Sequence, residues 1–256
     1  MYAFHGADSK VGCTMCAQCT AEILADEFPD EKVLFLSLNG NPSNNYMCED
    51  TIPIEAFKMQ LDSGVDVDRS LLRPSRKREN FYFISGVSDE LSERYYFPET
   101  AERLLENIKD SFRIIIADTG SRLDNGLAFG GLLGSKKNFL VLAQEEGCLR
   151  RYERIRAVYA KVGISFDRYI INKYSAGEAY TMKYISKRLG IPEERMLKLE
   201  RSSYGREADI SYKSLLDFEN DKFARDIIAI ASEIGEAAGL PPINKKRKGH
   251  GKILFR

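Results

Sequence analysis

Short, continuous apolar runs recur along the chain and alternate with longer stretches that have helical periodicity. The run at residues 31–39 is apolar on both faces and is bounded by turn residues, which is typical of a strand buried on both sides in a parallel sheet. The strands predicted in this way cover residues 2–4, 31–39, 80–85, 112–118, 138–143, 167–173 and 196–199.

The intervening stretches carry apolar residues at helical spacing and predict helices over residues 14–28, 54–61, 98–110, 145–161, 179–189, 213–218 and 221–238. Strands that alternate with helices indicate a doubly wound α/β domain, with a mainly parallel sheet, helices on both faces and a ligand site at the carboxyl ends of the strands. We expect one such domain over residues 1–240, followed by a basic, flexible tail over residues 241–256. The glycine-rich segment 126–134 is expected to be either flexible or closely packed.

The first thirty residues carry the clearest chemical signal. A short apolar run leads into a small, polar loop that contains glycine, residues 5–12, and a helix-forming stretch follows directly. This layout of strand, glycine loop and helix is that of a phosphate-binding P-loop, because the loop amides and the amino end of the helix concentrate partial positive charge at one place. Lys10 is the only cation in the loop.

The loop resembles the deviant Walker A motif, KGGxGKT, of the MinD/ParA/TadZ-like superfamily of P-loop ATPases. Gly12 and Thr14 match that motif, and Leu24-Ala25 falls where the family's following helix ends. The signature lysine position, however, holds Asp8, and the P-loop lysine position holds Cys13. The resemblance implies a SIMIBI-like P-loop fold that binds ATP and Mg²⁺ and acts as a nucleotide-dependent dimer. The implied phosphate-binding residues are Lys10, Val11, Gly12, Cys13, Thr14 and Met15.

Three strand ends extend the resemblance. Asp118, in an Asp-Thr-Gly sequence, falls at the Walker B position and is expected to reach Mg²⁺ together with Thr14; the alternative is an aspartate that caps a turn. Asn172 falls where the family reads the adenine edge; a turn-forming asparagine is the competing interpretation. Asn39 replaces the aspartate that helps the attacking water. An amide is not a base, so we predict no catalytic residue in this chain.

Two further kinds of residue cluster, one of cysteines and one of basic residues, each allow more than one interpretation. Cys13, Cys16 and Cys19 have a spacing found in iron–sulfur proteins, with Cys48 or Cys148 as a fourth ligand, but the same spacing on a helix also places small residues against a sheet. Basic residues gather at 69–78 and in the tail. The first group is either a solvated face or a patch for a partner or nucleic acid. The tail, which ends in a short apolar segment, is either solvated or makes a peripheral contact with membrane or nucleic acid.

Composition and charge limit the partners and the cellular location that we expect. The formal net charge is zero, with 38 basic and 38 acidic residues, so the overall charge favours no acidic partner. No apolar run reaches the roughly 18 residues of a spanning helix. The five cysteines, an odd number of which three are crowded together, do not suggest a secreted disulfide framework, and no signal-peptide pattern opens the chain. We therefore expect a cytoplasmic protein.

These observations lead to two main hypotheses. The first is a diverged ATP-binding protein with weak or absent hydrolysis that acts as a positioning or regulatory partner, with an unidentified protein partner and a homodimer expected. The second is a pseudo-ATPase scaffold that binds no nucleotide, which the carboxylate of Asp8 favours because it repels phosphate. A third hypothesis, which we rank lower, is an iron–sulfur or zinc protein that uses the cysteine triplet.

Overall fold

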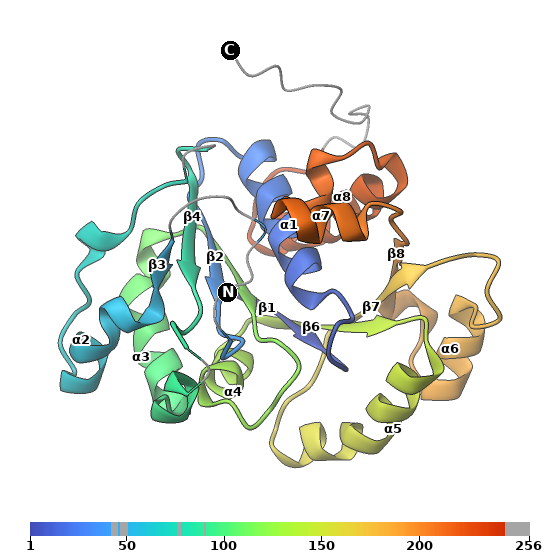
Figure 1. Cartoon of the computed structure of the whole chain (residues 1–256), viewed down its shortest axis with the longest axis horizontal. Coiled ribbons are helices and arrows are strands. Elements are labelled where there is room, and N and C mark those ends of the chain that lie inside the picture. Colours follow the sequence, from blue (N-terminus) through green and yellow to red (C-terminus); the bar gives the residue numbers. More distant parts are fainter. Residues whose placement is uncertain (42–45, 47–50, 76–77, 90, 244–256) are drawn as a thin grey trace.

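The chain forms a single twisted sheet with helices packed on both faces (Figure 1). The computed structural model describes residues 1–41, 46, 51–75, 78–89 and 91–243. Within these residues the sheet has eight strands in the order β3-β4-β2-β5-β1-β6-β7-β8, and every neighbouring pair is parallel. The strands are β1 (Tyr2–Gly6), β2 (Val33–Ser37), β3 (Ile52–Pro53), β4 (Phe81–Ser85), β5 (Ile114–Asp118), β6 (Lys137–Ala143), β7 (Arg168–Tyr174) and β8 (Met196–Glu200).

The helices divide between the two faces as right-handed crossovers require. The connection from β1 runs one way along the sheet through α1, whereas the connections that begin at β4, β5, β6 and β7 run the other way. α1 and α8 accordingly pack on each other, and α3 and α4 pack on each other. The helices are α1 (Cys13–Glu27), α2 (Lys58–Ser63), α3 (Pro98–Ile108), α4 (Gly126–Leu133), α5 (Glu146–Lys161), α6 (Met182–Leu189), α7 (Gly205–Ser211) and α8 (Asp221–Ala237).

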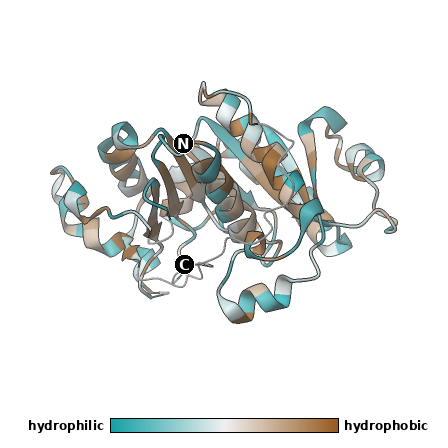
Figure 2. Ribbon diagram, turned by 90° about the horizontal axis from the view of Figure 1, so that it is seen from above, coloured by the Kyte–Doolittle hydropathy of each residue, from teal (hydrophilic) through white to brown (hydrophobic). Residues whose placement is uncertain are grey.

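The core is built around strands whose residues are buried on both faces. All five residues of β2 and all five of β5 are buried, which explains their unbroken apolar runs. Aromatic rings stack across neighbouring or nearby strands, Phe4 on Phe139 and Phe35 on Phe83, each with ring centroids 4.9 Å apart. In Figure 2 the central strands are brown, and the outer helices carry teal residues on their solvent side. The predicted doubly wound, parallel α/β fold is confirmed.

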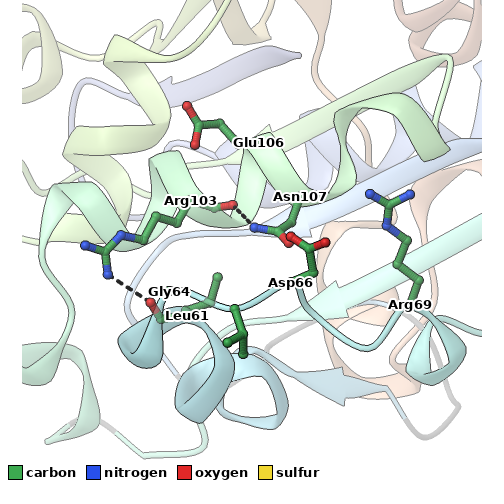
Figure 3. Close-up of a pocket in the computed structure, with 8 residues that line it drawn as sticks. Leu61, Gly64, Asp66, Arg69, Arg103, Glu106 and Asn107 are labelled. Atoms are coloured by element: carbon green, nitrogen blue, oxygen red, sulfur yellow. Dashed lines mark hydrogen bonds between the residues drawn. The ribbon is translucent and has the colours of Figure 1, made fainter.

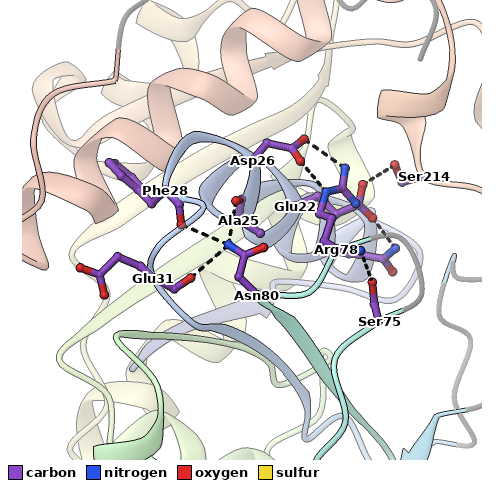
Figure 4. Close-up of polar contacts among 10 residues, drawn as sticks. Glu22, Ala25, Asp26, Phe28, Glu31, Ser75, Arg78, Asn80 and Ser214 are labelled. Carbon is purple, nitrogen blue, oxygen red and sulfur yellow. Dashed lines mark hydrogen bonds and ion pairs between the residues drawn. The ribbon is translucent and has the colours of Figure 1, made fainter. Parts of the chain in front are cut away.

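A polar network fixes the carboxyl end of α1 (Figure 4). The Asn80 side-chain amide lies within 3.1 Å of the carbonyl oxygens of Ala25, Phe28 and Glu31, so it satisfies acceptors that the helix leaves open at this end. Arg78 donates to both carboxylate oxygens of Asp26, at 2.5 and 3.0 Å. Arg78, one cation of the basic segment 69–78, therefore forms an ion pair within the fold. Arg76 and Lys77 of that segment lie outside the described residues.

Local differences from the expected elements have packing causes. Segment 126–134 contains helix α4, which lies so close to the start of α3 that a Cβ on Gly130 would come within 2.2 Å of the Pro98 carbonyl oxygen. The expected helix over residues 213–218 is only a single 3-10 turn, Leu215–Asp217. Helix α7 and strand β3 had no sequence signal, because both are short and largely exposed or half-buried.

None of the helices among the described residues is long and apolar enough to cross a lipid bilayer. The predicted tail lies outside the description from residue 244 onward. The last described residue, Ile243, is buried in the core.

Candidate functional site

The loop between β1 and α1, residues 7–12, adopts a conformation with two left-handed residues. Gly12 caps α1 with φ 86°, and a Cβ at this position would lie 2.4 Å from the Asn172 side-chain nitrogen, so only glycine fits. Lys10 has φ 59°, a conformation that non-glycine residues seldom adopt. Lys10 occupies the second glycine position of the KGG part of the motif, so the backbone turns as a glycine loop does although the residue has changed.

Hydrogen bonds anchor the start of the loop, whereas the backbone amides later in the loop are unpaired. Gly6 N–H donates to the Gly120 carbonyl at 2.6 Å, and Ala7 N–H donates to the Val141 carbonyl at 2.8 Å. Ser9 N–H donates to the Asp8 carboxylate. From residue 10 to residue 14, the backbone amides find no acceptor anywhere in the described part of the chain. Consecutive free amides at a helix start form a cradle for an anion.

Thr14 and Asp118 meet directly beside this cradle. Thr14 Oγ1 donates to Asp118 Oδ2 at 2.6 Å, and the Gly120 amide donates to Asp118 Oδ1 at 3.0 Å. The sheet brings them together, because β5 lies between β1 and β2 and Asp118 pairs in register with Phe4 on one side and Ser37 on the other. Asp118 is fully buried. The two residues predicted to share a metal site are therefore neighbours.

The groups at this point fit a hard divalent cation. A hydroxyl and a carboxylate are the oxygen donors that Mg²⁺ takes from proteins when phosphate and water supply its other ligands. Asn39 also contacts Asp118, and its Nδ2 donates to Asp118 Oδ2 at 3.1 Å. Asn39 thus places an amide donor where a carboxylate would repel Asp118.

Cys13 brings no positive charge to the loop. Burial, followed by the charge of Asp118, raises the pKa of the Cys13 thiol well above its usual value, so the thiol stays protonated at neutral pH. The side chain is 7% exposed. A buried neutral thiol cannot meet a phosphate oxygen as a lysine does.

The remaining predicted residues take supporting positions. Asn172 Nδ2 donates to the Val11 carbonyl at 2.7 Å, and Asn172 Oδ1 accepts from the Lys173 amide, so this side chain holds the loop in the structure. Met15 is buried, and its sulfur accepts a hydrogen bond from the Leu215 amide. Val11 is also buried, whereas Lys10 is exposed.

Two cations reach the loop that the sequence did not single out. Arg151, from α5, donates through Nε to the Ala7 carbonyl at 3.1 Å and lies 3.4 Å from the Asp8 carboxylate. Lys173 donates through Nζ to the Lys10 carbonyl at 2.8 Å. Arg151 sits among several charged residues of its helix and gave no local signal. Lys173 directly follows Asn172, so its proximity to the loop could have been anticipated.

The cysteine triplet lies on the buried side of α1. Cys13, Cys16 and Cys19 are all free and buried, and burial raises the pKa of each thiol. Metal ligation requires thiolates, which this environment disfavours. Among the described residues, no group of three or more His, Cys, Asp or Glu side chains is placed to hold a metal. Cys48, one of the two expected fourth ligands, lies outside the described residues.

A shallow cavity elsewhere contains none of the predicted site residues. Its volume is about 370 Å³, and it lies between α2 and α3, where Leu61, Asp66, Arg69, Arg103 and Asn107 line it (Figure 3). Arg103 already donates to the Leu61 carbonyl, and Asn107 accepts from the Val67 amide. Arg103 and Asn107 of this cavity thus serve local structure.

The fold is that of the MinD/ParA class of P-loop ATPases. A ParA family ATPase from Chlorobium tepidum TLS has this fold with a TM-score of 0.73 and 18% sequence identity, and the match covers 90% of this chain and 97% of that one. The septum site-determining protein MinD complexed with Mg-ADP from Pyrococcus horikoshii OT3 matches with a TM-score of 0.73 and 16% identity, over 93% of this chain and 96% of that one. The MinC:MinD cell division protein complex from Aquifex aeolicus matches with a TM-score of 0.70 and 15% identity, over 92% of this chain and 95% of that one. No protein-family model and no curated protein matches the sequence. At these identities the likeness establishes the fold.

Proposed function

We propose that this chain is a diverged MinD/ParA-like nucleotide-binding protein that holds ATP with Mg²⁺ at loop 7–14. The observation that carries the proposal is the contact between Thr14 and Asp118 at 2.6 Å, next to free loop amides. A phosphate chain fits the amides because they lie at the amino end of a buried 15-residue helix. The Mg-ADP complex of the MinD structure with the same fold supports this choice of ligand.

Hydrolysis is proposed to be weak or absent. Two groups expected to stabilise the transition state are missing, a lysine at Cys13 and an aspartate at Asn39. Loss of one preorganised donor to a developing charge typically reduces kcat by about 100- to 1,000-fold. Bound Mg²⁺ would neutralise phosphate charge, and Thr14 and Asp118 would hold it. We expect the remaining residues of the site to bind and orient the nucleotide rather than to activate water.

A protein that binds a nucleotide without rapid turnover can still act through a partner that it binds. We propose a positioning or regulatory role, with a homodimer and a protein partner that recognises the nucleotide-bound state. The MinC:MinD complex, in which a protein of this fold is bound to another protein, supports this role. A peripheral contact through the basic tail is a further part of the proposal. Liposome flotation of the full chain against a variant ending at Ile243 tests it, and equal flotation would remove the tail from the account.

Nucleotide binding is tested by thermal unfolding in the presence of Mg²⁺ with ATP, ADP or neither. Saturating ATP at about 100 times Kd stabilises the folded state by about 2.7 kcal/mol. The Gly12→Ala variant should lose this stabilisation, because a Cβ there collides with Asn172 and φ is positive. The matched control is Gly147→Ala, where a Cβ meets open space and φ is not left-handed.

The outcomes separate the two main hypotheses. A shift in the wild type and in Gly147→Ala that is lost in Gly12→Ala supports nucleotide binding at the loop. No shift with either nucleotide supports the pseudo-ATPase scaffold instead. Asp8 repels phosphate less in the folded protein than its own charge suggests, because Arg151 lies 3.4 Å from the Asp8 carboxylate and offsets that charge.

A further inference from the structure

Two cations from other elements contact the loop. Its two lysine positions hold Asp8 and Cys13, so the loop lacks a cation at both of them and Lys10 is its only lysine. Arg151 from α5 and Lys173 from β7 each donate a hydrogen bond to a carbonyl oxygen of the loop. These residues lie 144 and 163 positions away in sequence from their loop partners, so the fold brings them there.

Arg151 is held in a way that leaves its donor face available. Its Nε contacts both the Ala7 carbonyl and the Asp8 carboxylate, which fixes the plane of the guanidinium. Across the described residues, neither of its two terminal nitrogens has a hydrogen-bond acceptor. The side chain is 41% exposed, so a ligand can reach it. A guanidinium with two free terminal nitrogens matches two oxygens of a phosphate group.

Lys173 is directed at the loop by an irregularity in its strand. The pairing of β7 with β8 shifts register between Ile171 and Tyr174, and Lys173 itself has φ 54°. A bulge of this kind turns a side chain away from the alternation of the strand and is common next to functional sites. The left-handed conformation of Lys173 costs free energy, which its contact with the Lys10 carbonyl and the hydrogen bond from its amide to Asn172 offset.

The two contacts also orient the loop. Each cation binds a carbonyl oxygen, at Ala7 and at Lys10, on either side of the segment where the free amides begin. A trans peptide directs its carbonyl and the following amide in opposite directions, so the Lys10 carbonyl held by Lys173 leaves the Val11 amide facing away from that cation. The cations thus contribute both charge and the loop conformation that an anion requires.

We propose that Arg151 and Lys173 supply the positive charge for a nucleotide phosphate chain that positions 8 and 13 of the loop no longer provide. This assignment rests on the proposed nucleotide-binding function. Asp8 then acts as a holding group for Arg151, which releases part of its contact when phosphate binds.

The test is titration of ATP with Mg²⁺ into the full chain and into Arg151→Ala, Arg151→Lys and Lys173→Ala. Loss of a charge-assisted contact to phosphate should weaken ATP binding by about tenfold to a hundredfold in both alanine variants. Arg151→Lys should recover only part of the loss, since an ammonium does not bind two oxygens in a fixed plane. The matched control is Arg150→Ala, because Arg150 pairs with Glu146 and is the adjacent arginine on the same helix.

A second variant changes affinity in the opposite direction. Asp8→Asn removes the competing carboxylate from Arg151, so ATP should bind more tightly than to the wild type. Raising the salt concentration should weaken ATP binding to the wild type more than to Arg151→Ala. A merely structural role for Arg151 would produce neither result, even if Arg151→Ala were less stable.

The outcomes distinguish the two levels of the proposal. If the wild type binds ATP and Arg151→Ala, Lys173→Ala and Arg150→Ala bind it equally well, the assignment of the two cations is wrong and the proposed function stands. If the wild type binds no nucleotide, the proposed function fails and this assignment fails with it. Selective weakening in the Arg151 and Lys173 variants supports both.

Discussion

Thr14 Oγ1 and Asp118 Oδ2 lie 2.6 Å apart although 104 positions separate the two residues in sequence. The contact joins the first turn of α1 to the carboxyl end of β5, and both elements begin or end at the same edge of the sheet. Asn39, at the end of β2, donates to the same carboxylate oxygen. Three connections of the fold therefore meet at one buried carboxylate, which is the centre of the proposed site.

Replacing Thr14 with valine should weaken binding of ATP with Mg²⁺ by about tenfold or more. Valine keeps the shape of threonine but removes the hydroxyl that contacts Asp118, and a hydrogen bond to a charged group contributes about 1.5–3 kcal/mol. Titration in the presence of Mg²⁺ and in EDTA should show that the loss is confined to the Mg²⁺ condition, because the hydroxyl is one of the proposed metal ligands.

The control for this substitution is Thr20→Val on the same helix. Thr20 is also buried and donates to the Cys16 carbonyl, away from Asp118. It should lose stability in chemical denaturation without losing affinity for ATP. Thr14→Ser should bind nearly as the wild type does. Equal affinities for Thr14→Val and the wild type would show that Thr14 does not hold the metal.

Replacing Asn39 with aspartate should make folding dependent on Mg²⁺. The new carboxylate would face Asp118 at the position of an amide that now donates at 3.1 Å, so one of the two carboxyls would have a raised pKa. We expect a loss of about 2 kcal/mol at neutral pH in EDTA, from the lost hydrogen bond and the added repulsion.

The stability deficit of the Asn39→Asp variant should change with pH in one direction. A raised carboxyl pKa means that the folded state binds a proton that the unfolded state has lost, so the deficit should be small near pH 4 and grow as the pH rises toward 7. Mg²⁺ should restore much of the loss. Urea unfolding at several pH values, with and without Mg²⁺, measures this, and a deficit that Mg²⁺ leaves unchanged would contradict a metal site at Asp118.

The sequence predicted the fold and the loop for reasons that are local. The apolar runs of β2 and β5 and the helix after Gly12 each show their burial in their own residue pattern. The pairing of Thr14 with Asp118 followed from the order of the elements. The contact of Arg151 with the loop could not be predicted in the same way, since it depends on how α5 lies in three dimensions. The position of Lys173 after Asn172 places it near the loop, but its hydrogen bond to the Lys10 carbonyl depends on the bulge in β7.

For Asn172 the sequence predicted the position of the residue but not its hydrogen-bond partner. The sequence placed it at the end of a strand but could not show that its amide nitrogen donates to the Val11 carbonyl of the loop. Its role in reading a base stays a prediction, since that amide would have to exchange its present partner. Short elements such as α7 were missed because seven residues with one buried side chain leave little pattern.

His5 should make the protein less stable in mild acid. It lies in β1 and bonds to the Thr119 and Tyr159 hydroxyl groups, and burial lowers its pKa from 6.5 to about 4. Below pH 6.5 the unfolded chain binds a proton that the folded chain does not, so stability is full above that pH and falls as the pH drops toward 4. Between pH 7.5 and 5 this group should cost about 2 kcal/mol.

The comparison that isolates this effect is wild type against His5→Gln in urea unfolding at the two pH values. Burial raises the pKa of Glu22, which acts in the opposite direction, but Glu22 is present in both proteins and cancels in the difference. The wild type should lose about 2 kcal/mol more than the variant. Parallel losses in the two proteins would mean that His5 is not held in its neutral form.

The thiols of Cys13, Cys16 and Cys19 should be inert in the folded protein. Because burial raises the pKa of each, little thiolate is present at pH 7.5, and alkylation followed by peptide mapping should label them only after denaturation. Protein purified without oxygen should carry less than one equivalent of iron or zinc. One bound equivalent that is lost in Cys16→Ser would instead revive the metal-protein hypothesis.

The most direct test of the account is isothermal titration of ATP with Mg²⁺ into the full wild-type chain. The account predicts saturable binding of one nucleotide per chain with a micromolar Kd, about −8 kcal/mol, and slow or no release of phosphate in a parallel turnover assay. Absence of heat at several temperatures, together with no change in thermal unfolding, would contradict the account and leave a scaffold that uses the fold without the nucleotide.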